Sequence, residues 1–314
     1  MSEPGKPRIA VLLPCYNEEA AIAATIAGFK AALPGATIFV YDNNSSDRTV
    51  EVARTAGAIV RTEKQQGKGH VVRRMFADVE ADVYIMADGD LTYDPKSAPA
   101  MVDLLLAEEL DMVVGTRRQE AKDAYRGGHV LGNRLFTGLL SGLFGRSFSD
   151  IFSGYRIFSR RFVKSFPVLS SGFEIETEMS VHALELRMPV GEVETAYGAR
   201  PEGSESKLST FRDGWRILKT IATLYRIERP VLFFGTIGAL LLAAAIILSI
   251  PLVMTYLDTG LVPRFPTAIL ATGLVIIAVL CFFAGLILDT VTRGRREMRR
   301  LAYLAVPGPV TEPA

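Results

Sequence analysis

Two long uncharged segments near the C-terminus constrain this chain more than any other feature. Residues 231–254 and residues 267–288 contain no Asp, Glu, Lys or Arg. Each is longer than the roughly 18 apolar residues that mark a candidate membrane-spanning helix. A buried core helix is the alternative interpretation, but two such segments separated by a short loop favour a hairpin of two spans. They also explain why 49% of the residues are hydrophobic, more than a soluble protein needs.

The arginines that flank these segments predict the orientation of the hairpin, because Lys and Arg are retained on the cytoplasmic side of membrane spans. Two arginines precede the first segment and five follow the second: Arg226, Arg229, Arg293, Arg295, Arg296, Arg299 and Arg300. We therefore predict a multi-pass protein of the cytoplasmic (inner) membrane, with the N-terminal domain and both termini facing the cytoplasm. No secretory signal is expected, because the first apolar run, residues 9–14, is too short.

The part of the chain before residue 231 is nearly neutral. The chain has 35 Lys and Arg and 34 Asp and Glu, of which six and four follow residue 230, leaving 29 against 30. Nucleic-acid binding usually requires a basic excess or stripe, so we do not expect it. Cys15 and Cys281 are the only cysteines, and Cys281 lies in a predicted span. Neither a disulfide framework nor a cysteine zinc site is available.

Residues 8–116 alternate between short apolar runs and amphipathic segments, which is typical of an α/β domain with a mostly parallel sheet. The predicted strands are residues 9–14, 37–41, 58–61, 83–87 and 112–115. The predicted helices are residues 18–32, 47–56, 69–79 and 95–107. Ligands of such sheets bind beyond the carboxyl ends of the strands, and the polar motifs of this chain fall there.

A pair of carboxylates follows the strand predicted at residues 83–87. Asp88-Gly89-Asp90 places two hard oxygen ligands one residue apart, where a buried strand opens into a loop. Such ligands hold Mg²⁺ or Mn²⁺ against a substrate diphosphate. Plain turn chemistry is the alternative, because Asp and Gly are common in turns.

Three further motifs follow the other strands: PCYNEE at residues 14–19, DNNSSDRT at 42–49 and QGKG at 66–69. Ser46 or Asp47 is a candidate helix cap, which leaves Asp42 without an explanation. The third motif either brings backbone N–H groups and a lysine to an anion or forms a Gly-rich turn. No GxGxxG follows the first strand and no GxxxxGK[ST] is present, so hydride transfer and ATP-driven chemistry lose their main support.

Taken in order, these motifs resemble the nucleotide-sugar domain of family 2 glycosyltransferases, which have the Rossmann-like GT-A fold. The matching positions are Pro14-x-Tyr16-Asn17-Glu18-Glu19, Asp42-x-x-Ser45-x-Asp47-x-Thr49, Gly67-Lys68-Gly69 and Asp88-x-Asp90. The resemblance implies a divalent metal held by Asp88 and Asp90. The nucleotide-sugar-binding residues that we predict are Pro14, Tyr16, Asn17, Glu18, Asp42, Asn44, Lys68, Asp88 and Gly89.

Two positions depart from the family pattern. The family often has a second acid directly after the first in the Asp42 motif, where this chain has Asn43. Related enzymes often have a further metal ligand, frequently Gln, two residues after the second acid of the metal motif. Thr92 stands there in this chain. We predict that Thr92 ligates the metal through its hydroxyl, or that Asp94 or a water takes this place.

Later motifs resemble the polyprenyl-phosphate branch of the family, which includes dolichol-phosphate mannose synthases and bacterial undecaprenyl-phosphate glycosyltransferases. They are Gly115-Thr116-Arg117, Gly132-Asn133-Arg134, Ser153-Gly154-Tyr155-Arg156 and Phe173-Glu174-Ile175-Glu176. The resemblance implies that Arg117 and Arg134 bind the acceptor phosphate, and Arg126 is a second candidate. We predict Asp90, Asp150 and Glu176 as catalytic residues.

The predicted function is transfer of a hexose-type sugar, with inversion, from a nucleotide sugar to a polyprenyl phosphate. UDP is preferred over GDP on resemblance to the bacterial members. The alternatives are a processive polysaccharide synthase, which has more spans and a Gln-x-x-Arg-Trp motif, and a non-catalytic membrane scaffold. The hairpin also offers surface for a homo-oligomer.

The predicted boundaries give four segments. They are a cytoplasmic catalytic domain at residues 1–207, a juxtamembrane amphipathic helix at 208–230, the hairpin at 231–290 and a basic cytoplasmic tail at 291–314. A further apolar segment at residues 128–148 carries Arg134 and Arg146, and we expect it to lie at the level of the lipid headgroups.

Overall fold

The computed structural model describes residues 7–119, 148–172, 174–198 and 225–309, together with four isolated residues, Gly138, Gly142, Ala222 and Thr223. Two compact units make up the described chain. One contains the N-terminal domain and the residues from Arg299 onward, and the other contains the remainder of two long C-terminal helices up to Met298.

A seven-stranded sheet forms the centre of the first unit, in the order β3-β2-β1-β4-β6-β5-β7. Its strands are β1 (Ile9–Cys15), β2 (Thr37–Asp42), β3 (Ile59–Thr62), β4 (Val83–Met86), β5 (Met112–Gln119), β6 (Arg156–Ser159) and β7 (Val190–Tyr197). All described pairings are parallel except those of β6, which is antiparallel to both β4 and β5. The predicted mostly parallel α/β fold is therefore confirmed, and β6 and β7 are additions to it.

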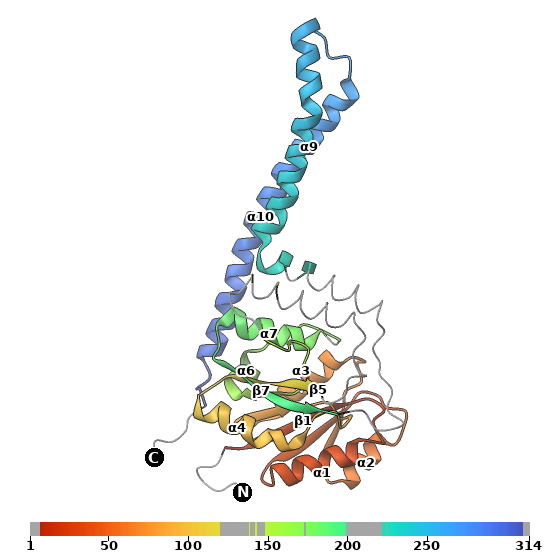
Figure 1. The fold of residues 1–314 in the computed structure, drawn as a ribbon, viewed down its shortest axis with the longest axis vertical. Helices are drawn as coiled ribbons and strands as arrows, with labels where there is room; N and C mark the ends of the chain where they lie inside the picture. The colour runs from red at the N-terminus through yellow and green to blue at the C-terminus, as the bar shows by residue number, and fades with distance from the viewer. Residues whose placement is uncertain are drawn as a thin grey trace. The chain divides into compact units, whose positions relative to one another are not determined.

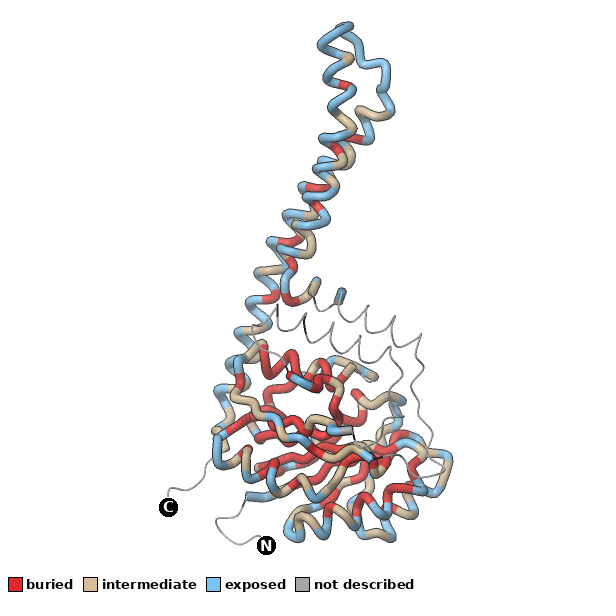
Figure 2. The backbone as a smooth tube through the Cα atoms, in the orientation of Figure 1, coloured by how far each residue is buried: buried red, intermediate tan, exposed pale blue. Residues whose placement is uncertain are grey.

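Helices cover both faces of this sheet (Figure 1). They are α1 (Ile22–Ala32), α2 (Thr49–Thr55), α3 (Lys68–Asp78), the 3₁₀ turn η1 (Pro95–Ser97), α4 (Ala98–Ala107), α6 (Arg160–Ser165) and α7 (Ile175–Leu186). Figure 1 shows α1 and α2 on one side and α6 and α7 on the other. Because both faces are covered, the central strands are buried almost throughout, as Figure 2 shows.

Each face has its own apolar core. On one side Val11 and Leu13 of β1 join Ile26 and Phe29 of α1 in a single cluster of buried side chains. On the other side the aromatic ring of Phe76 in α3 lies edge-on to that of Phe158 in β6, with 5.7 Å between centroids. The alternation of side chains along each strand produces the two cores and fixes the register of the sheet.

Two long helices form the second unit: α9 (Pro230–Thr259) and α10 (Phe265–Leu304), of which α10 reaches into the first unit. Both are long and apolar enough to cross a membrane, and only 11% and 17% of their most apolar stretches are buried. Such low burial is unlike that of a core helix, which is mostly buried (Figure 2). Close packing occurs at small residues, since a Cβ on Gly238 would lie 3.0 Å from the Ala278 carbonyl oxygen.

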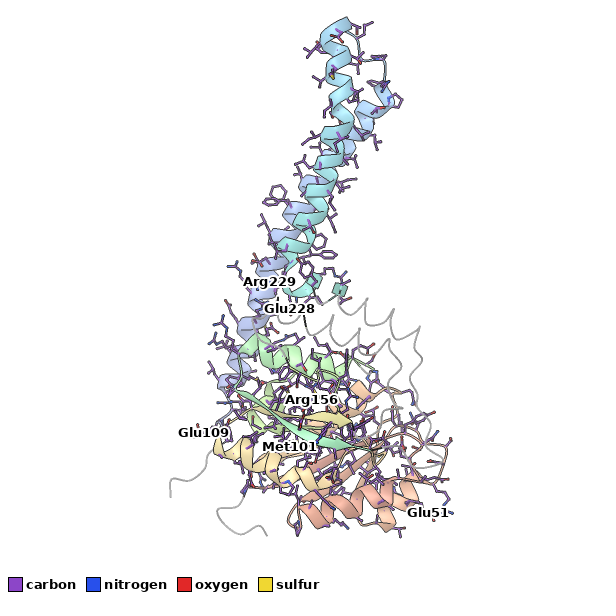
Figure 3. All side chains as sticks on the ribbon, viewed as in Figure 1. Glu51, Met101, Glu109, Arg156, Glu228 and Arg229 are labelled. Atoms are coloured by element: carbon purple, nitrogen blue, oxygen red, sulfur yellow. The ribbon has the colours of Figure 1, made fainter. Side chains whose placement is uncertain are left out.

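Polar contacts connect α10 with the residues directly before α9. Glu228, labelled in Figure 3, is 6% exposed and accepts a 2.6 Å bond from Arg296. The hydroxyl of Thr292 donates to the carbonyl oxygen of Ile227 at 3.0 Å. Both contacts lie beyond the predicted end of the second span at residue 288, because α10 continues as a polar helix to Leu304.

The last turns of α10 belong to the first unit. Asp111, which is fully buried, accepts hydrogen bonds from the Arg161 Nε at 2.9 Å, the Ser159 hydroxyl at 2.7 Å and the Tyr303 hydroxyl at 2.8 Å. Arg299 pairs with Glu185 of α7. The boundary that we predicted at residue 290 therefore falls inside a helix, whose end packs against the domain.

A buried histidine makes the stability of this unit depend on pH. His182 in α7 packs against the rings of Phe162 and Phe166, and its Nε2 is 3.2 Å from the Ser165 hydroxyl. Burial, with a smaller effect of the Arg299 charge, lowers the pKa of His182 to about 3. The unfolded chain therefore binds this proton more strongly than the folded one, and stability is lost as the pH falls below about 6.5.

Lowering the pH from 7 to 5 is expected to cost the wild type about 2 kcal/mol more than a His182→Leu variant, because each pH unit in this window contributes about 1.4 kcal/mol. Thermal unfolding of the detergent-solubilised chain at both pH values measures the difference. His70→Gln, which changes a histidine bonded to Arg73 near the surface, is the control and should keep the wild-type slope. Equal slopes for His182→Leu and the wild type would contradict the assignment.

Candidate active site

The Asp88-Gly89-Asp90 loop follows β4 and packs against the end of β1. A Cβ on Gly89 would overlap the Cys15 sulfur, so only glycine fits there. The hydroxyl of Thr25 in α1 donates to the Gly89 carbonyl oxygen at 3.2 Å. These contacts hold the two carboxylates at the carboxyl edge of the sheet, where the sequence predicts them.

Asp90 is almost fully buried and is bonded to Thr92. The backbone N–H and the hydroxyl of Thr92 both donate to Asp90 Oδ1, at 3.2 and 2.6 Å. Asp94 instead accepts from the N–H of Lys96 at the start of η1, as a helix cap does. Thr92 thus orients the carboxylate of Asp90, and its predicted role as a metal ligand stays a prediction.

A lysine joins two of the predicted acidic residues. Lys68 Nζ lies 2.5 Å from Asp88 Oδ1 and 2.5 Å from Glu176 Oε1. Burial lowers the pKa of Lys68, but the two carboxylates raise it by more, so the net shift is upward and the lysine is charged at neutral pH. The three side chains come from α3, the loop after β4 and α7.

The loops after β1 and β2 interlock beside this cluster. The N–H of Asn17 donates to the Ser45 hydroxyl at 2.9 Å, and Asn17 Oδ1 accepts from the N–H of Ser46 at 2.8 Å. The N–H of Glu18 donates to the Thr49 hydroxyl at 2.8 Å. Asn17 has the positive φ of 54° that asparagine tolerates better than most residues. The hydrogen bonds thus make one rigid edge from two loops.

The predicted nucleoside residues lie along this edge. Pro14 pairs in register with Tyr41 at the ends of the two strands, and Asp42 is 3% exposed, with its carboxylate accepting from the N–H of Ser45 at 3.3 Å. Tyr16 is 36% exposed, which leaves an aromatic ring at the surface beside them. Asp47 accepts from the N–H of Thr49 at 3.0 Å, but Arg48, and neither Ser46 nor Asp47, stands at the N-cap of α2.

Asn43 is one of the two residues that depart from the family pattern, and both the nitrogen and the oxygen of its side-chain amide form hydrogen bonds. Its Nδ2 donates to the carbonyl oxygens of Glu63 and Gln65, at 3.0 and 2.8 Å, and its Oδ1 accepts from the N–H of Gly67 at 2.7 Å. A carboxylate has no proton to donate and would repel both carbonyl oxygens. The amide therefore secures the segment that leads to Lys68.

Asn43→Asp is expected to lower the free energy of unfolding by about 2 kcal/mol, because two carbonyl oxygens lose their donor and a buried carboxylate faces both of them. Thermal or urea unfolding of the solubilised chain measures the loss. Asn44→Asp is the matched control, since Asn44 is exposed and its amide donates to one backbone carbonyl oxygen, that of Lys64, and to the exposed side chain of Gln66. Equal stability of the two variants would show that the Asn43 hydrogen bonds contribute little.

Arg117 and Asp150 form an ion pair farther along the sheet. Arg117 Nε and Nη2 donate to the two oxygens of Asp150 at 2.7 and 2.8 Å, and the guanidinium carbon lies 5.4 Å from the centroid of the Tyr197 ring. Burial lowers the pKa of Arg117, but the bond to Asp150, together with the charge of Asp150 and the effects of Tyr93 and Tyr197, raises it by more, so the net shift is upward. Strand β5 continues to Gln119, beyond the predicted end at residue 115, which places Arg117 within the strand.

Arg156 supports the loop that carries Asp150, a role that the sequence alone did not reveal. It is fully buried and donates to the carbonyl oxygens of Ile151 and Ser153, at 2.6 and 2.9 Å, and to the Ser180 hydroxyl at 2.9 Å (Figure 3). Burial lowers the pKa of Arg156 to about 10, so it stays charged at neutral pH. Its place in the Ser153-Gly154-Tyr155-Arg156 motif was the available signal.

Tyr93 was also missed, although it lies three residues after Asp90. Its hydroxyl accepts from the N–H of Gly154 at 2.8 Å, and its ring packs against Tyr155 and Tyr197, with centroids 5.3 and 5.2 Å away. Tyr93 therefore connects the acidic loop with the loop that carries Asp150. An aromatic residue directly after a metal-type motif was the only signal in the sequence.

Several predicted residues lie outside the described part of the chain. They are Arg126 and Arg134, nearly all of the apolar segment at 128–148, and most of the predicted juxtamembrane helix at 208–230. Their roles stay predictions.

The residues that could hold a divalent metal are Asp88 and Asp90. Gly154 leaves room beside them, since a Cβ there would lie 3.0 Å from Asp88 Oδ2 and 3.3 Å from Lys68 Nζ. No group of three acidic, histidine or cysteine side chains with metal-site geometry occurs in the described residues. Two carboxylates fit Mg²⁺ or Mn²⁺, which commonly take their remaining ligands from water and substrate phosphates.

Fold and site together define a class: an α/β enzyme whose acidic site lies at the carboxyl edge of a mostly parallel sheet, in a chain with two apolar helices. The chain belongs to glycosyl transferase family 2, whose model matches residues 10–166. It is 35% identical to glycosyltransferase AglJ of Haloferax volcanii over 237 residues, 75% of this chain and 78% of that protein. It is 28% identical to the dolichyl-phosphate hexose transferase of the same organism over 221 residues, 70% and 95% of the two chains.

A solved structure shares the fold. It is the glucosyl-3-phosphoglycerate synthase of Mycobacterium tuberculosis in complex with Mn²⁺, uridine diphosphate and phosphoglyceric acid. The two chains are 25% identical, with a TM-score of 0.57 over 70% of this chain and 78% of that one. The predicted family and GT-A fold are thereby confirmed, and the chain is a glycosyltransferase.

Proposed function

We propose that this enzyme transfers a hexose-type sugar, with inversion at the anomeric carbon, from a nucleoside diphosphate sugar to a polyprenyl phosphate. The observation that carries the proposal is the adjacency of two sites within one unit. The acidic loop at Asp88 and Asp90 is linked through Tyr93 and Gly154 to the loop that holds Asp150 against Arg117. The name of the dolichyl-phosphate hexose transferase supports the lipid acceptor.

The donor site is proposed at the interlocked loops after β1 and β2. Tyr16 offers a ring for the base, and Asp42, at the end of β2, is placed to accept hydrogen bonds from the ribose. UDP is preferred over GDP, which the uridine diphosphate of the synthase with the same fold supports. The diphosphate would extend from there toward Asp88, Asp90 and Lys68.

A divalent metal fits the two carboxylates, and when bound it would neutralise the charge that develops on the departing nucleoside diphosphate. Thr92 holds the Asp90 carboxylate in one orientation through two hydrogen bonds. Gly154 keeps the other side of Asp88 clear of any side chain. These residues provide a preformed geometry, which lowers the cost of binding the donor.

The acceptor phosphate is proposed to bind at Arg117, with Arg134 and Arg126 as further candidates. A phosphomonoester loses its second proton near pH 6, so the attacking oxygen is already ionised at neutral pH and needs no strong base. Asp150 keeps the guanidinium of Arg117 in place through two bonds. Alignment of this oxygen with the anomeric carbon is then the main contribution of the protein. Glu176 and Asp150 are proposed to stabilise positive charge on the sugar.

The membrane arrangement follows from the same proposal. The apolar helices α9 and α10 hold the enzyme at the membrane that contains its acceptor, and the flanking arginines favour a catalytic domain and termini in the cytoplasm. The domain boundaries and the juxtamembrane role of residues 208–230 belong to this proposal.

The test is a panel of nucleotide sugars, including UDP- and GDP-hexoses, assayed with purified enzyme and undecaprenyl phosphate. Mass spectrometry of the lipid fraction identifies the product. We expect one donor to give a polyprenyl-phosphate sugar in a reaction that requires Mg²⁺ or Mn²⁺. Transfer to water or to a soluble acceptor, without a lipid product, would overturn the proposal.

A further inference from the structure

Lys68 bridges the carboxylates of Asp88 and Glu176, and these two side chains differ in their exposure to solvent. Its side chain is 10% exposed and that of Glu176 is 6% exposed, whereas that of Asp88 is 31% exposed. The bond to Glu176 is therefore enclosed, and the bond to Asp88 faces the open side of the cluster. Of the two, the bond to Asp88 is the one that a ligand from solution can reach.

The backbone at the start of α3 fixes the position of Lys68 relative to Glu176. Gly67 has a φ of 134°, which favours glycine, and a Cβ on either Gly67 or Gly69 would overlap a carbonyl oxygen of the segment before α7, at Ser171 or Ser170. The N–H of Gly69 donates to the Ser171 oxygen at 3.2 Å. Because α3 starts in direct contact with the segment that leads into α7, Lys68 and Glu176 stay neighbours.

The charges of the cluster match a divalent cation only if the lysine is counted. Asp88, Asp90 and Glu176 contribute three negative charges when ionised, and Lys68 contributes one positive charge. The sum equals the charge that a divalent cation neutralises. A metal bound to the same carboxylate repels the Lys68 ammonium at this distance and weakens its short bond to Asp88.

We propose that Lys68 is a placeholder cation, which bridges Asp88 and Glu176 in the metal-free enzyme and, when a metal binds Asp88, keeps Glu176 and transfers its other bond to the donor diphosphate. The inference rests on the proposed function for the identity of the diphosphate. Gly154 provides the space for this movement, since the position of its missing Cβ lies 3.3 Å from Lys68 Nζ.

This role makes metal and nucleotide binding depend on each other. Without nucleotide, Lys68 competes with the metal for Asp88 and weakens metal binding. With nucleotide, the displaced ammonium gains a phosphate, so metal and nucleotide each strengthen the binding of the other. If Lys68 served only to hold Asp88 in place, its removal would weaken metal binding, because Asp88 would lose its orientation.

The experiment measures Mn²⁺ binding to the full-length detergent-solubilised enzyme by electron paramagnetic resonance, with and without UDP or GDP. Lys68→Met is expected to bind Mn²⁺ about tenfold more tightly than the wild type without nucleotide, and to gain less Mn²⁺ affinity from the nucleotide than the wild type does, because the part of the gain that depends on Lys68 is lost. Unchanged or weaker Mn²⁺ binding by Lys68→Met without nucleotide would overturn the proposal, as would a wild type that binds no Mn²⁺.

Two further variants make the result independent of the folding of Lys68→Met. Glu176→Gln removes a negative charge and leaves Lys68 to Asp88 alone, so we expect weaker Mn²⁺ binding, and tighter binding would contradict the proposal. Lys64→Met changes an exposed lysine in the segment before α3 and should bind Mn²⁺ as the wild type does.

The same samples separate this inference from the proposed function. Lipid transfer by the wild type, combined with weaker Mn²⁺ binding by Lys68→Met, would overturn the placeholder role and leave the function intact. The expected Mn²⁺ pattern without any lipid product would support the placeholder role and refute the acceptor.

Discussion

Asp90→Ala is expected to lower the turnover number on the order of 10³-fold while the enzyme remains folded, because it removes a carboxylate from the proposed metal site. Asp90 is 3% exposed, and its carboxylate accepts two bonds from Thr92, so the change also releases that segment. Initial rates with a radiolabelled nucleotide sugar and polyprenyl phosphate, at saturating metal, measure the effect. Thermal unfolding of the same preparation establishes that the variant is folded.

Asp103→Ala is the matched control for this experiment, since Asp103 is an exposed carboxylate on α4. It should retain the wild-type rate and metal dependence. An Asp90→Ala enzyme that keeps substantial activity with metal present would refute the assignment of the Asp88-Gly89-Asp90 loop as the centre of the reaction.

Arg117→Ala is expected to raise the KM for the lipid acceptor about 10- to 100-fold with little change in the KM for the nucleotide sugar, because a charge-assisted contact to the phosphate is lost. It should also lower stability by about 2 kcal/mol, since Asp150 is 8% exposed and loses its partner. Steady-state kinetics with each substrate varied in turn, together with thermal unfolding, measure both effects.

Two variants separate phosphate binding from the support of Asp150. Asp150→Asn keeps the guanidinium and should lower kcat more than it changes the lipid KM. Arg118→Ala removes the exposed arginine next in the strand and should behave as the wild type. A defect of Arg117→Ala confined to the nucleotide sugar would place this residue in the donor site. Arg134→Ala is also expected to raise the KM for the lipid, an expectation that rests on the family resemblance alone.

The first half of the fold was predictable from the sequence, because local patterns of apolar and polar residues specify its strands and helices. Strands β1 to β4 are short apolar runs between helical segments, and each is followed by turn-forming polar residues. Strand β6 was missed because it begins with Arg156, whose burial depends on acceptors from Ile151, Ser153 and α7. No local pattern distinguishes such an arginine from a surface one.

The candidate site was predictable as a set of residues but not as a set of contacts. The motifs predicted Asp88, Asp90 and Arg117, and Asp150 was predicted separately as a candidate catalytic carboxylate. The pairing of Arg117 with Asp150 joins residues 33 apart in sequence, and that of Lys68 with Asp88 joins residues 20 apart. Such pairings depend on strand order and on the position of each loop in three dimensions, which the spacing of residues in the sequence does not determine.

Strand β6 has a consequence for how this enzyme can evolve. It is the one antiparallel strand of the described sheet, and it separates β3-β2-β1-β4, whose loops form the proposed donor site, from β5 and β7, where Arg117 lies. The loops after β1 and β2 are bonded to each other, whereas the acidic loop after β4 reaches β7, because Tyr93 packs against Tyr197. Substitutions beside Arg117 can therefore change the acceptor contacts while the loops after β1 and β2 keep theirs, and the acidic loop is coupled to both sides of β6 through Tyr93.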